Sequence, residues 1–129
     1  MTGATILLVE DNVQNRYLAT FLLQQHGHKV VPAADGREAL ELAVRLQPHL
    51  ILLDIQLPVM DGYTVARALR VIPLLQAVPI VAVTSHAMVG DRERCLAAGC
   101  DGYIEKPINP ETFVVEIHRY LKSNPPRPS

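Results

Sequence analysis

The amino-acid sequence predicts an α/β protein: a doubly wound, five-stranded parallel sheet with five helices distributed over both faces. Three short apolar runs, each stopping at a polar residue, predict strands buried on both faces, at residues 6–9, 50–53 and 79–83. Helical patterns and two weaker strands complete five β–α repeats, and such alternation is typical of parallel sheets with right-handed crossovers. The 129-residue length and 49% apolar content fit one domain.

The first two helices are predicted from their spacing and their ends. One spans residues 12–26 and stops at Gly27, a residue that readily adopts a left-handed conformation. A weaker strand over residues 28–33 follows. The second helix starts after Asp35, whose spacing to Glu38 predicts a capping box. Helical spacing in the two segments is shown by Leu18, Phe21, Leu22, Gln25, Ala39, Leu42, Ala43 and Leu46.

The third helix is predicted over residues 63–71, after a loop in which Asp61 serves the turn before a glycine, and Pro73 ends it. Pro79 opens the next strand, because a first strand position needs no ladder donor.

The last third of the chain predicts a helix over residues 88–98, stopped by Gly99, and a short strand over residues 102–105. Asn109 and Pro110 then supply the N-cap and first position of a final helix. Its inward stripe is Val114, Ile117 and Leu121.

The strand order follows from apolarity. The first, third and fourth strands are the most apolar and are expected at the centre, with the second and fifth at the edges. The simple order that meets this condition is 2-1-3-4-5. Ligands of such sheets bind at the carboxyl ends of the strands, beside the switch point between strands one and three, where Asp11 and Asp54 lie.

Composition excludes several partners. The formal net charge is -1 and no Lys/Arg run is present, so neither nucleic acid nor an anionic membrane is favoured. No apolar stretch approaches the roughly 20 residues of a membrane span, and residues 1–4 lack the charged start of a signal peptide. We therefore expect a cytoplasmic monomer or weak dimer without membrane insertion. Cys95 and Cys100 are interpreted as small buried residues.

Five polar residues at strand ends are expected to form one site: Glu10, Asp11, Asp54, Thr84 and Lys106. Gathered carboxylates repel by about 4 kcal/mol per pair at close range. A cation must therefore join them, either the lysine or a hard divalent ion, Mg²⁺ with Mn²⁺ as a possible substitute. Such a set suits attack by a carboxylate on a phosphoryl group, and the acceptor is expected to be the aspartate alone at the centre of the sheet.

Four segments of the chain resemble the receiver domain of two-component response regulators, which has the flavodoxin-like fold of CheY. They are Val9-Glu10-Asp11-Asn12, residues 53–62, Val83-Thr84-Ser85 and Glu105-Lys106-Pro107. The resemblance covers residues 5 to about 122, which suggests a receiver at residues 1–123 and a disordered tail at 124–129. The start of the first helix and residues 83–91 also resemble single-domain regulators of the DivK type.

The resemblance implies a role for each site residue. Asp54 is then the phosphoacceptor, and it binds Mg²⁺ together with Asp11 and the backbone carbonyl of Gln56, while Glu10 acts mainly through water. Thr84 and Lys106 bind the phosphoryl group.

The resemblance also implies residues that sense or adjust phosphorylation. Tyr103 matches an aromatic residue that swings inward on activation, although it also fits an edge residue with its hydroxyl in water. Gln56 and His86 border the phosphoryl group and tune its lifetime, unless they simply face solvent. The Lys106–Pro107 bond is a candidate cis peptide. The output face is expected at the fourth helix, fifth strand and fifth helix.

The implied partners are a histidine kinase or histidine phosphotransfer protein as donor, and a downstream protein target. A phosphorelay intermediate, which passes the phosphoryl group to a histidine phosphotransfer protein, remains an alternative. The chain stops near Ser129, so no output domain is expected. A haloacid dehalogenase-like phosphatase is the remote enzyme alternative, but Gln56 stands where its general acid is needed. A flavodoxin-like flavin binder is disfavoured because the acidic residues after the first strand would repel the flavin phosphate. The remaining histidines are interpreted as ordinary surface or edge residues: His26, His28, His49 and His118.

Overall fold

The computed structural model describes residues 3–85 and 90–123. Within these residues the chain forms a five-stranded, wholly parallel sheet in the order β2-β1-β3-β4-β5, as predicted. The strands are β1 Thr5–Val9, β2 Lys29–Ala33, β3 Leu50–Asp54, β4 Ile80–Thr84 and β5 Gly102–Glu105. The helices are α1 Val13–Gln25, α2 Gly36–Leu46, α3 Gly62–Arg70, α4 Asp91–Ala97 and α5 Phe113–Ser123, with a 3₁₀ turn, η1, at Pro73–Leu75.

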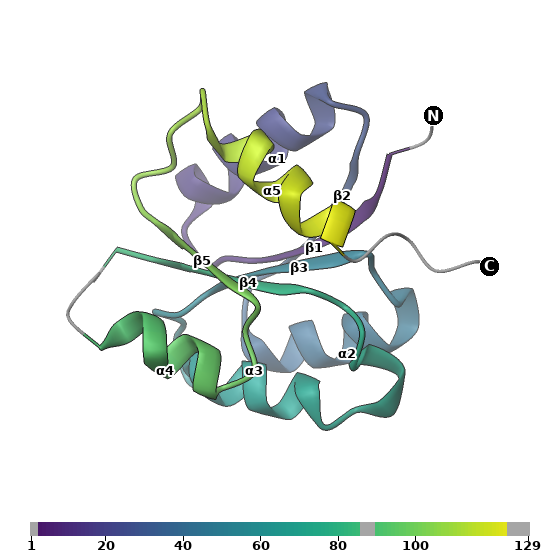
Figure 1. The fold of residues 1–129 in the computed structure, drawn as a ribbon, viewed down its shortest axis with the longest axis vertical. Helices are drawn as coiled ribbons and strands as arrows, with labels where there is room; N and C mark the ends of the chain where they lie inside the picture. The colour runs from purple at the N-terminus through teal and green to yellow at the C-terminus, as the bar shows by residue number, and fades with distance from the viewer. Residues whose placement is uncertain (1–2, 86–89, 124–129) are drawn as a thin grey trace.

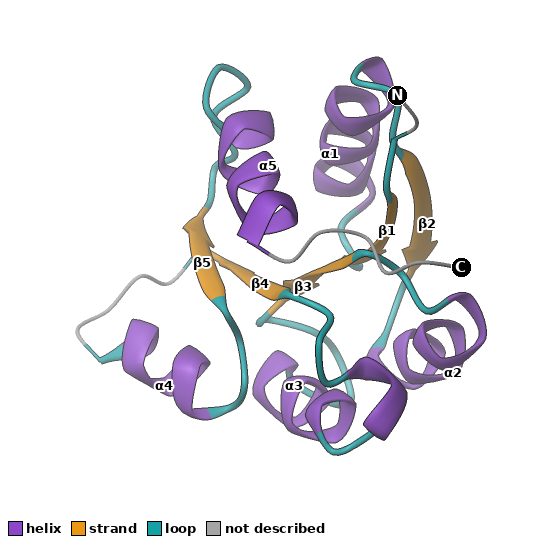
Figure 2. Ribbon diagram, turned by 45° about the vertical axis from the view of Figure 1, so that its right-hand side comes forward, coloured by secondary structure: helices purple, strands orange, loops and turns teal. Residues whose placement is uncertain are grey.

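The sheet separates two layers of helices. Helices α1 and α5 cover one face, and α2, α3 and α4 cover the other (Figures 1 and 2). Every residue of β3 and β4 is buried. Because successive side chains of a strand point to opposite faces of the sheet, the apolar residues of these strands contribute alternately to two cores. Leu7, Ile51 and Leu53 belong to the core beneath α2 and α3. Ile6, Leu50 and Leu52 belong to the core beneath α1 and α5.

Side-chain caps fix where the first three helices begin. Each cap accepts a hydrogen bond from a backbone N–H in the first turn, which would otherwise lack a partner. The cap and donor pairs are Asn12 with Asn15, Asp35 with Glu38, and Asp61 with Thr64, all at 2.9 Å. Gly27 follows α1 with a φ of 83°, the left-handed conformation expected of this stop.

The start of α5 differs from the prediction. The Oδ1 of Asn109 accepts a hydrogen bond from the N–H of Glu111, so it caps a turn, but the helix itself begins only at Phe113. The predicted capping by the Asn109 side chain is therefore present, but the prediction of Pro110 as the first helical residue was wrong. The turn over residues 110–112 precedes the apolar stripe, whose burial at Val114 and Ile117 sets the helix.

Two further helix predictions need comment. In α1 the buried residues are Ala19, Leu22 and Leu23, whereas Phe21 is 46% exposed and stacks on Tyr17, so the predicted stripe is rotated. In α4 the structure shows the helix from Asp91, and the predicted start at residue 88 lies outside the described residues.

The two edge strands differ from the central three. Strand β2 includes the exposed Pro32, paired with Leu8 of β1, and β5 is only four residues long. Among the described residues, no helix is both long and apolar enough to span a bilayer.

Candidate functional site

Backbone hydrogen bonds between parallel strands bring the polar residues at the carboxyl ends of the strands to the same end of the sheet. Asp54 is the last residue of β3. Glu10 follows β1, and its N–H donates to the carbonyl of Ala33 at 3.0 Å. Lys106 follows β5, and its N–H donates to the carbonyl of Thr84 at 2.8 Å. Parallel strand pairing therefore places residues that are far apart in the sequence close together in space.

A lysine joins two buried carboxylates at this edge. The Nζ of Lys106 lies 2.9 Å from Oε1 of Glu10 and 3.3 Å from Oδ2 of Asp54. Glu10 is 4% exposed and Asp54 is 3% exposed, so neither charge is well solvated. The N–H of Gln56 donates to the other oxygen of Asp54 at 3.0 Å. These contacts fix the orientation of the Asp54 carboxylate.

The pKa values of Glu10 and Lys106 are shifted because these charged groups and Asp54 lie close together in a buried site. The pKa of Glu10 is raised, foremost because burial disfavours its charged form and then because Asp54 lies beside it, although Lys106 opposes the shift. Burial acts to lower the pKa of Lys106, but the hydrogen bond to Glu10 and the attraction of Asp54 outweigh it, so this pKa is raised. The lysine therefore stays protonated between the two carboxylates.

The donor set fits a hard divalent cation. Carboxylate oxygens of Glu10, Asp11 and Asp54 lie within 4.8 Å of one another, and Asp11 is exposed beside the two buried residues. Oxygen ligands of this kind suit Mg²⁺ or Mn²⁺. One lysine charge does not neutralise three carboxylates, so a cation would relieve their repulsion. The residues at this edge therefore fit the predicted magnesium site.

Gln56 connects the ends of β3 and β4. Its Nε2 donates to the hydroxyl oxygen of Thr84 at 2.7 Å, and its Oε1 accepts from the N–H of Ser85 at 3.2 Å. Thr84 is only 2% exposed. The amide thus holds the threonine hydroxyl and the following loop together. This link was not predicted, because the sequence does not indicate where the Gln56 side chain points.

The loop after β3 packs tightly against the site. Gly62, the first residue of α3, lies so close to the β3 backbone that a Cβ would stand 2.6 Å from the carbonyl oxygen of Asp54. Only glycine fits such an approach without displacing the acceptor strand. Within the same loop, Val59 is fully exposed and has a φ of 68°, an unfavourable conformation for a β-branched residue.

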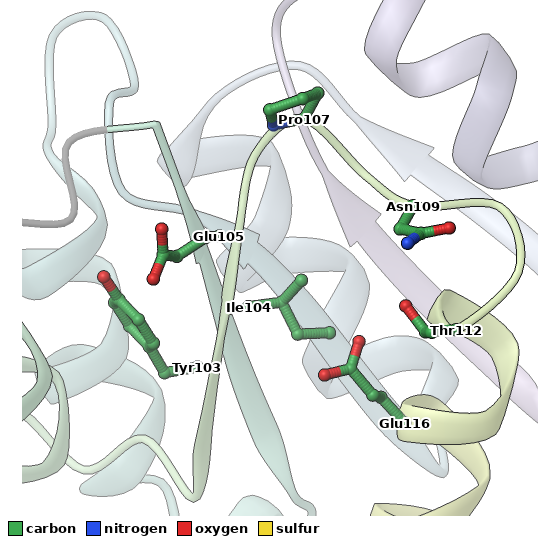
Figure 3. Close-up of a pocket in the computed structure, with 7 residues that line it drawn as sticks. All are labelled: Tyr103, Ile104, Glu105, Pro107, Asn109, Thr112 and Glu116. Atoms are coloured by element: carbon green, nitrogen blue, oxygen red, sulfur yellow. The ribbon is translucent and has the colours of Figure 1, made fainter.

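Tyr103 lies away from this cluster, on β5. It lines a pocket of about 290 Å³ between β5 and the start of α5 (Figure 3). The pocket carries two carboxylates, Glu105 and Glu116. The Tyr103 side chain is half-buried. Its inward movement on activation stays a prediction. The Lys106–Pro107 bond is cis, as expected. His86 lies outside the described residues.

Three histidines form a cluster that the sequence interpretation missed. His28 is 6% exposed, and its Nε2 lies 2.8 Å from the Nε2 of His118. The ring of His26 lies 6.0 Å from that of His118. Interpreting His28 and His118 as ordinary surface or edge positions was wrong, because the fold brings together these rings, 90 residues apart, whereas His26 is exposed as expected.

Comparisons with known proteins agree with this geometry. Residues 6–118 match the response regulator receiver domain. The chain is 41% identical over 117 residues to the polar-differentiation response regulator DivK of Brucella anthropi, which covers 91% of this chain and 95% of that protein. The same identity and coverage are found with DivK of Brucella ovis.

Solved structures give the same result. The chemotaxis response regulator CheY4 of Vibrio cholerae superposes with a TM-score of 0.88 at 34% identity, over 93% of this chain and 100% of that one. The receiver domain of sensor histidine kinase PA1611 of Pseudomonas aeruginosa, with a magnesium ion coordinated in its active site cleft, gives 0.86 at 39% identity, over 94% and 99%.

The chain belongs to the response regulator receiver family. Receiver domains in general accept a phosphoryl group, bind Mg²⁺ through acidic residues, and signal rather than act as enzymes. Over nearly its whole described length this chain is similar to DivK, and its fold is that of CheY.

Proposed function

We propose that this receiver accepts a phosphoryl group on Asp54 from a histidine kinase or histidine phosphotransfer protein, and that phosphorylation changes its α4-β5-α5 face to control partner binding. The observation that supports this most directly is the buried Asp54 carboxylate, 3.3 Å from the Nζ of Lys106 within the acidic cluster. The carboxylate is oriented before any donor arrives, which favours nucleophilic attack.

In the transfer, a carboxylate oxygen of Asp54 forms the new bond to phosphorus. The bond between phosphorus and the donor imidazole nitrogen breaks, and its electron pair returns to that nitrogen. Lys106 supplies positive charge to the phosphoryl oxygens. We propose that Mg²⁺ is held by Asp11, Asp54 and the Gln56 carbonyl, with Glu10 acting through water, and that it neutralises part of the phosphoryl charge when bound.

Phosphorylation would be sensed through Thr84. The added charge of roughly -1.5 to -2 attracts hydroxyl donors. Thr84 is held by the Gln56 amide in the present structure, so it must exchange that contact for a phosphoryl oxygen. Gln56 thereby influences both the cost of the switch and the phosphoryl lifetime. His86 is proposed to border the phosphoryl group as well, in agreement with its position two residues after Thr84.

The downstream partner would bind at the pocket between β5 and α5. Tyr103 contributes to the β5 wall of this pocket, but its ring lies on the other side of β5 from Ile104 and Glu116 (Figure 3). The ring packs against the core beneath α2 and α3, so its inward movement would change the α4 side of β5. Glu105 and Glu116 on its walls favour a partner segment with a basic side chain. Comparing the Tyr103 ring position with and without beryllofluoride tests the movement, and an unchanged ring removes that role.

The phosphodonor is proposed to dock on α1. Val13, Tyr17 and Phe21 are 66%, 72% and 46% exposed and lie four residues apart, so they form an apolar stripe on one helix face. The helix begins two residues after Asp11, so the stripe leads away from the acidic cluster. A donor helix on this stripe would bring its histidine towards Asp54.

Acceptance on Asp54 is tested with acetyl phosphate and Mg²⁺, followed by mass spectrometry of the intact protein. We expect one added phosphoryl group in the wild type and none in Asp54→Asn. Absence of the adduct from the wild type, or its persistence in the variant, contradicts the proposal.

Donor docking is tested with Tyr17→Ser. Transfer from a phosphorylated kinase should slow, whereas acetyl phosphate, which needs no helix surface, should react at the wild-type rate. A chase with an unphosphorylated histidine phosphotransfer protein then distinguishes a terminal regulator from a phosphorelay intermediate. Rapid return of the phosphoryl group to histidine would favour the relay.

A further inference from the structure

The histidine cluster joins three elements on the face of the sheet opposite α2, α3 and α4. His26 caps the end of α1, His28 precedes β2, and His118 lies in α5. Helices α1 and α5 cover the same face of the sheet (Figures 1 and 2). The rings of His28 and His118 meet edge to face, 5.0 Å apart. None of these residues belongs to the phosphorylation site.

Backbone contacts fix the tautomer of His28. The N–H of Ala4 points at the Nδ1 of His28, 3.0 Å away. An amide N–H can only donate, so this ring nitrogen must be an unprotonated acceptor. A neutral His28 therefore carries its proton on Nε2, where it donates to the Nε2 of His118 at 2.8 Å. His118 in turn must be neutral, with its proton on Nδ1.

Either added proton breaks this chain of hydrogen bonds. A proton on Nδ1 of His28 would face the N–H of Ala4, donor against donor. A proton on Nε2 of His118 would face the Nε2–H of His28 in the same way. The ring of His28 cannot avoid the conflict by changing tautomer, because both of its nitrogens are engaged.

We propose that His28 and His118 form a proton-sensitive clasp, which holds α5 against the starts of β1 and β2 only while both imidazoles are neutral. Acidification through the histidine range would release the clasp and loosen α5. Because Glu116 of α5 lines the pocket beside β5, the release would also alter that pocket. The clasp does not depend on phosphorylation of Asp54.

The surroundings favour neutral rings. The pKa of His28 is lowered, foremost because burial disfavours the charged ring and then because His118 and His26 repel it. Among the described side chains no carboxylate contributes to this shift. Two other titratable residues lie on neighbouring elements. Lys29, the first residue of β2, is exposed, and the side chain of Tyr120 in α5 packs over Gly102 of β5. A histidine whose pKa is lowered on folding stabilises the protein above its unfolded pKa of about 6.5, and this stability is lost as the pH falls.

A metal site is the other use for such a pair, but the hydrogen bonds oppose it. A histidine that binds metal through one nitrogen normally donates from the other. The second nitrogen of His28 accepts instead, from Ala4. The arrangement therefore suits a shared proton better than Zn²⁺.

The test is urea unfolding of the full chain at pH 7.5 and pH 5.5, followed by circular dichroism because the chain has no tryptophan. We expect acidification to raise the wild-type unfolding equilibrium constant at least about fivefold more than that of His28→Gln/His118→Gln, the effect of one ordinary hydrogen bond. His49→Gln is the matched control. Its ring also accepts from a β1 N–H, that of Thr5, but His49 lies outside the histidine cluster, so this variant should lose a smaller part of the pH response than the double variant.

An equal pH response in the wild type and the double variant would overturn the clasp. Stabilisation at pH 7.5 by one equivalent of Zn²⁺, seen in the wild type but not in the double variant, would also overturn it in favour of a metal site. Ring ¹⁵N chemical shifts of the wild type provide a test that needs no variant. They should show Nε2 of His28 protonated and Nε2 of His118 unprotonated at pH 7.5, and the reverse would contradict the inference.

Discussion

Replacing Gln56 with leucine should make the receiver easier to activate. In the structure the Gln56 amide donates to the Thr84 hydroxyl at 2.7 Å and accepts from the Ser85 N–H at 3.2 Å. If Thr84 must leave this contact to reach a phosphoryl oxygen, the hydrogen bond stabilises only the inactive arrangement. Gln56→Leu keeps a similar side-chain size and removes both contacts.

The magnitude follows from one exchanged hydrogen bond. A net contribution of about 0.5–1.5 kcal/mol to the inactive arrangement corresponds to a roughly two- to tenfold increase in affinity for a phosphoryl mimic. Gln56 is only half-buried, which places the expected effect towards the lower part of this range. The free energy of unfolding of the unliganded protein should fall by a similar amount.

The assay is a titration with beryllofluoride in saturating Mg²⁺, followed by calorimetry and by the amide resonance of Thr84. Ser85→Ala is the matched control, since among the described residues it removes the 3.4 Å contact between the Ser85 hydroxyl and the Gln56 Oε1 and keeps the hydrogen bond from Gln56 to Thr84. That variant should bind like the wild type. Unchanged or weaker binding by Gln56→Leu would refute the reasoning, because it would mean that the amide supports the active arrangement at least as well.

Three further substitutions test the fold and the charge cluster by urea unfolding. Asp54→Asn should gain about 1–3 kcal/mol of stability without divalent ions, because it removes carboxylate repulsion, and Mg²⁺ should shrink the gain; a loss without Mg²⁺ contradicts this. Arg70→Lys should lower the free energy of unfolding by about 2–3 kcal/mol, because lysine cannot reproduce the guanidinium hydrogen bonds to several loop carbonyls and to an aspartate. Arg67→Lys, in the same helix but exposed, should change the stability little. Val59→Asn should gain about 1 kcal/mol by relieving the left-handed backbone, and Val71→Asn, at an exposed site with ordinary φ, should not; equal effects at the two sites would contradict the strain.

The sequence was sufficient for the sheet and for the set of residues at its edge. Strands buried on both faces leave continuous apolar runs, so their limits and their central position are visible without any contacts. Parallel pairing then requires their polar ends to meet. The cluster of Glu10, Asp54 and Lys106 follows from this rule, because each of these residues stands at or directly after the end of an apolar strand.

Other features depend on side-chain direction and could not be predicted. The exposure of Phe21 depends on the rotation of α1 against the sheet, and several rotations fit the same apolar pattern. The contact of His28 with His118 depends on where α5 lies relative to the start of β2. Asn109 caps a turn in either case, and only packing of the later apolar stripe determines that the helix begins at Phe113.

The two edges of the sheet have consequences for behaviour in concentrated solution. An exposed edge strand offers unpaired backbone groups to another molecule and can seed aggregation. Pro32 in β2 has no N–H to offer, and β5 is short and ends in the exposed, charged Glu105. Both features hinder a second chain from extending the sheet. The protein can therefore keep five parallel strands in register without becoming a template for its own copies.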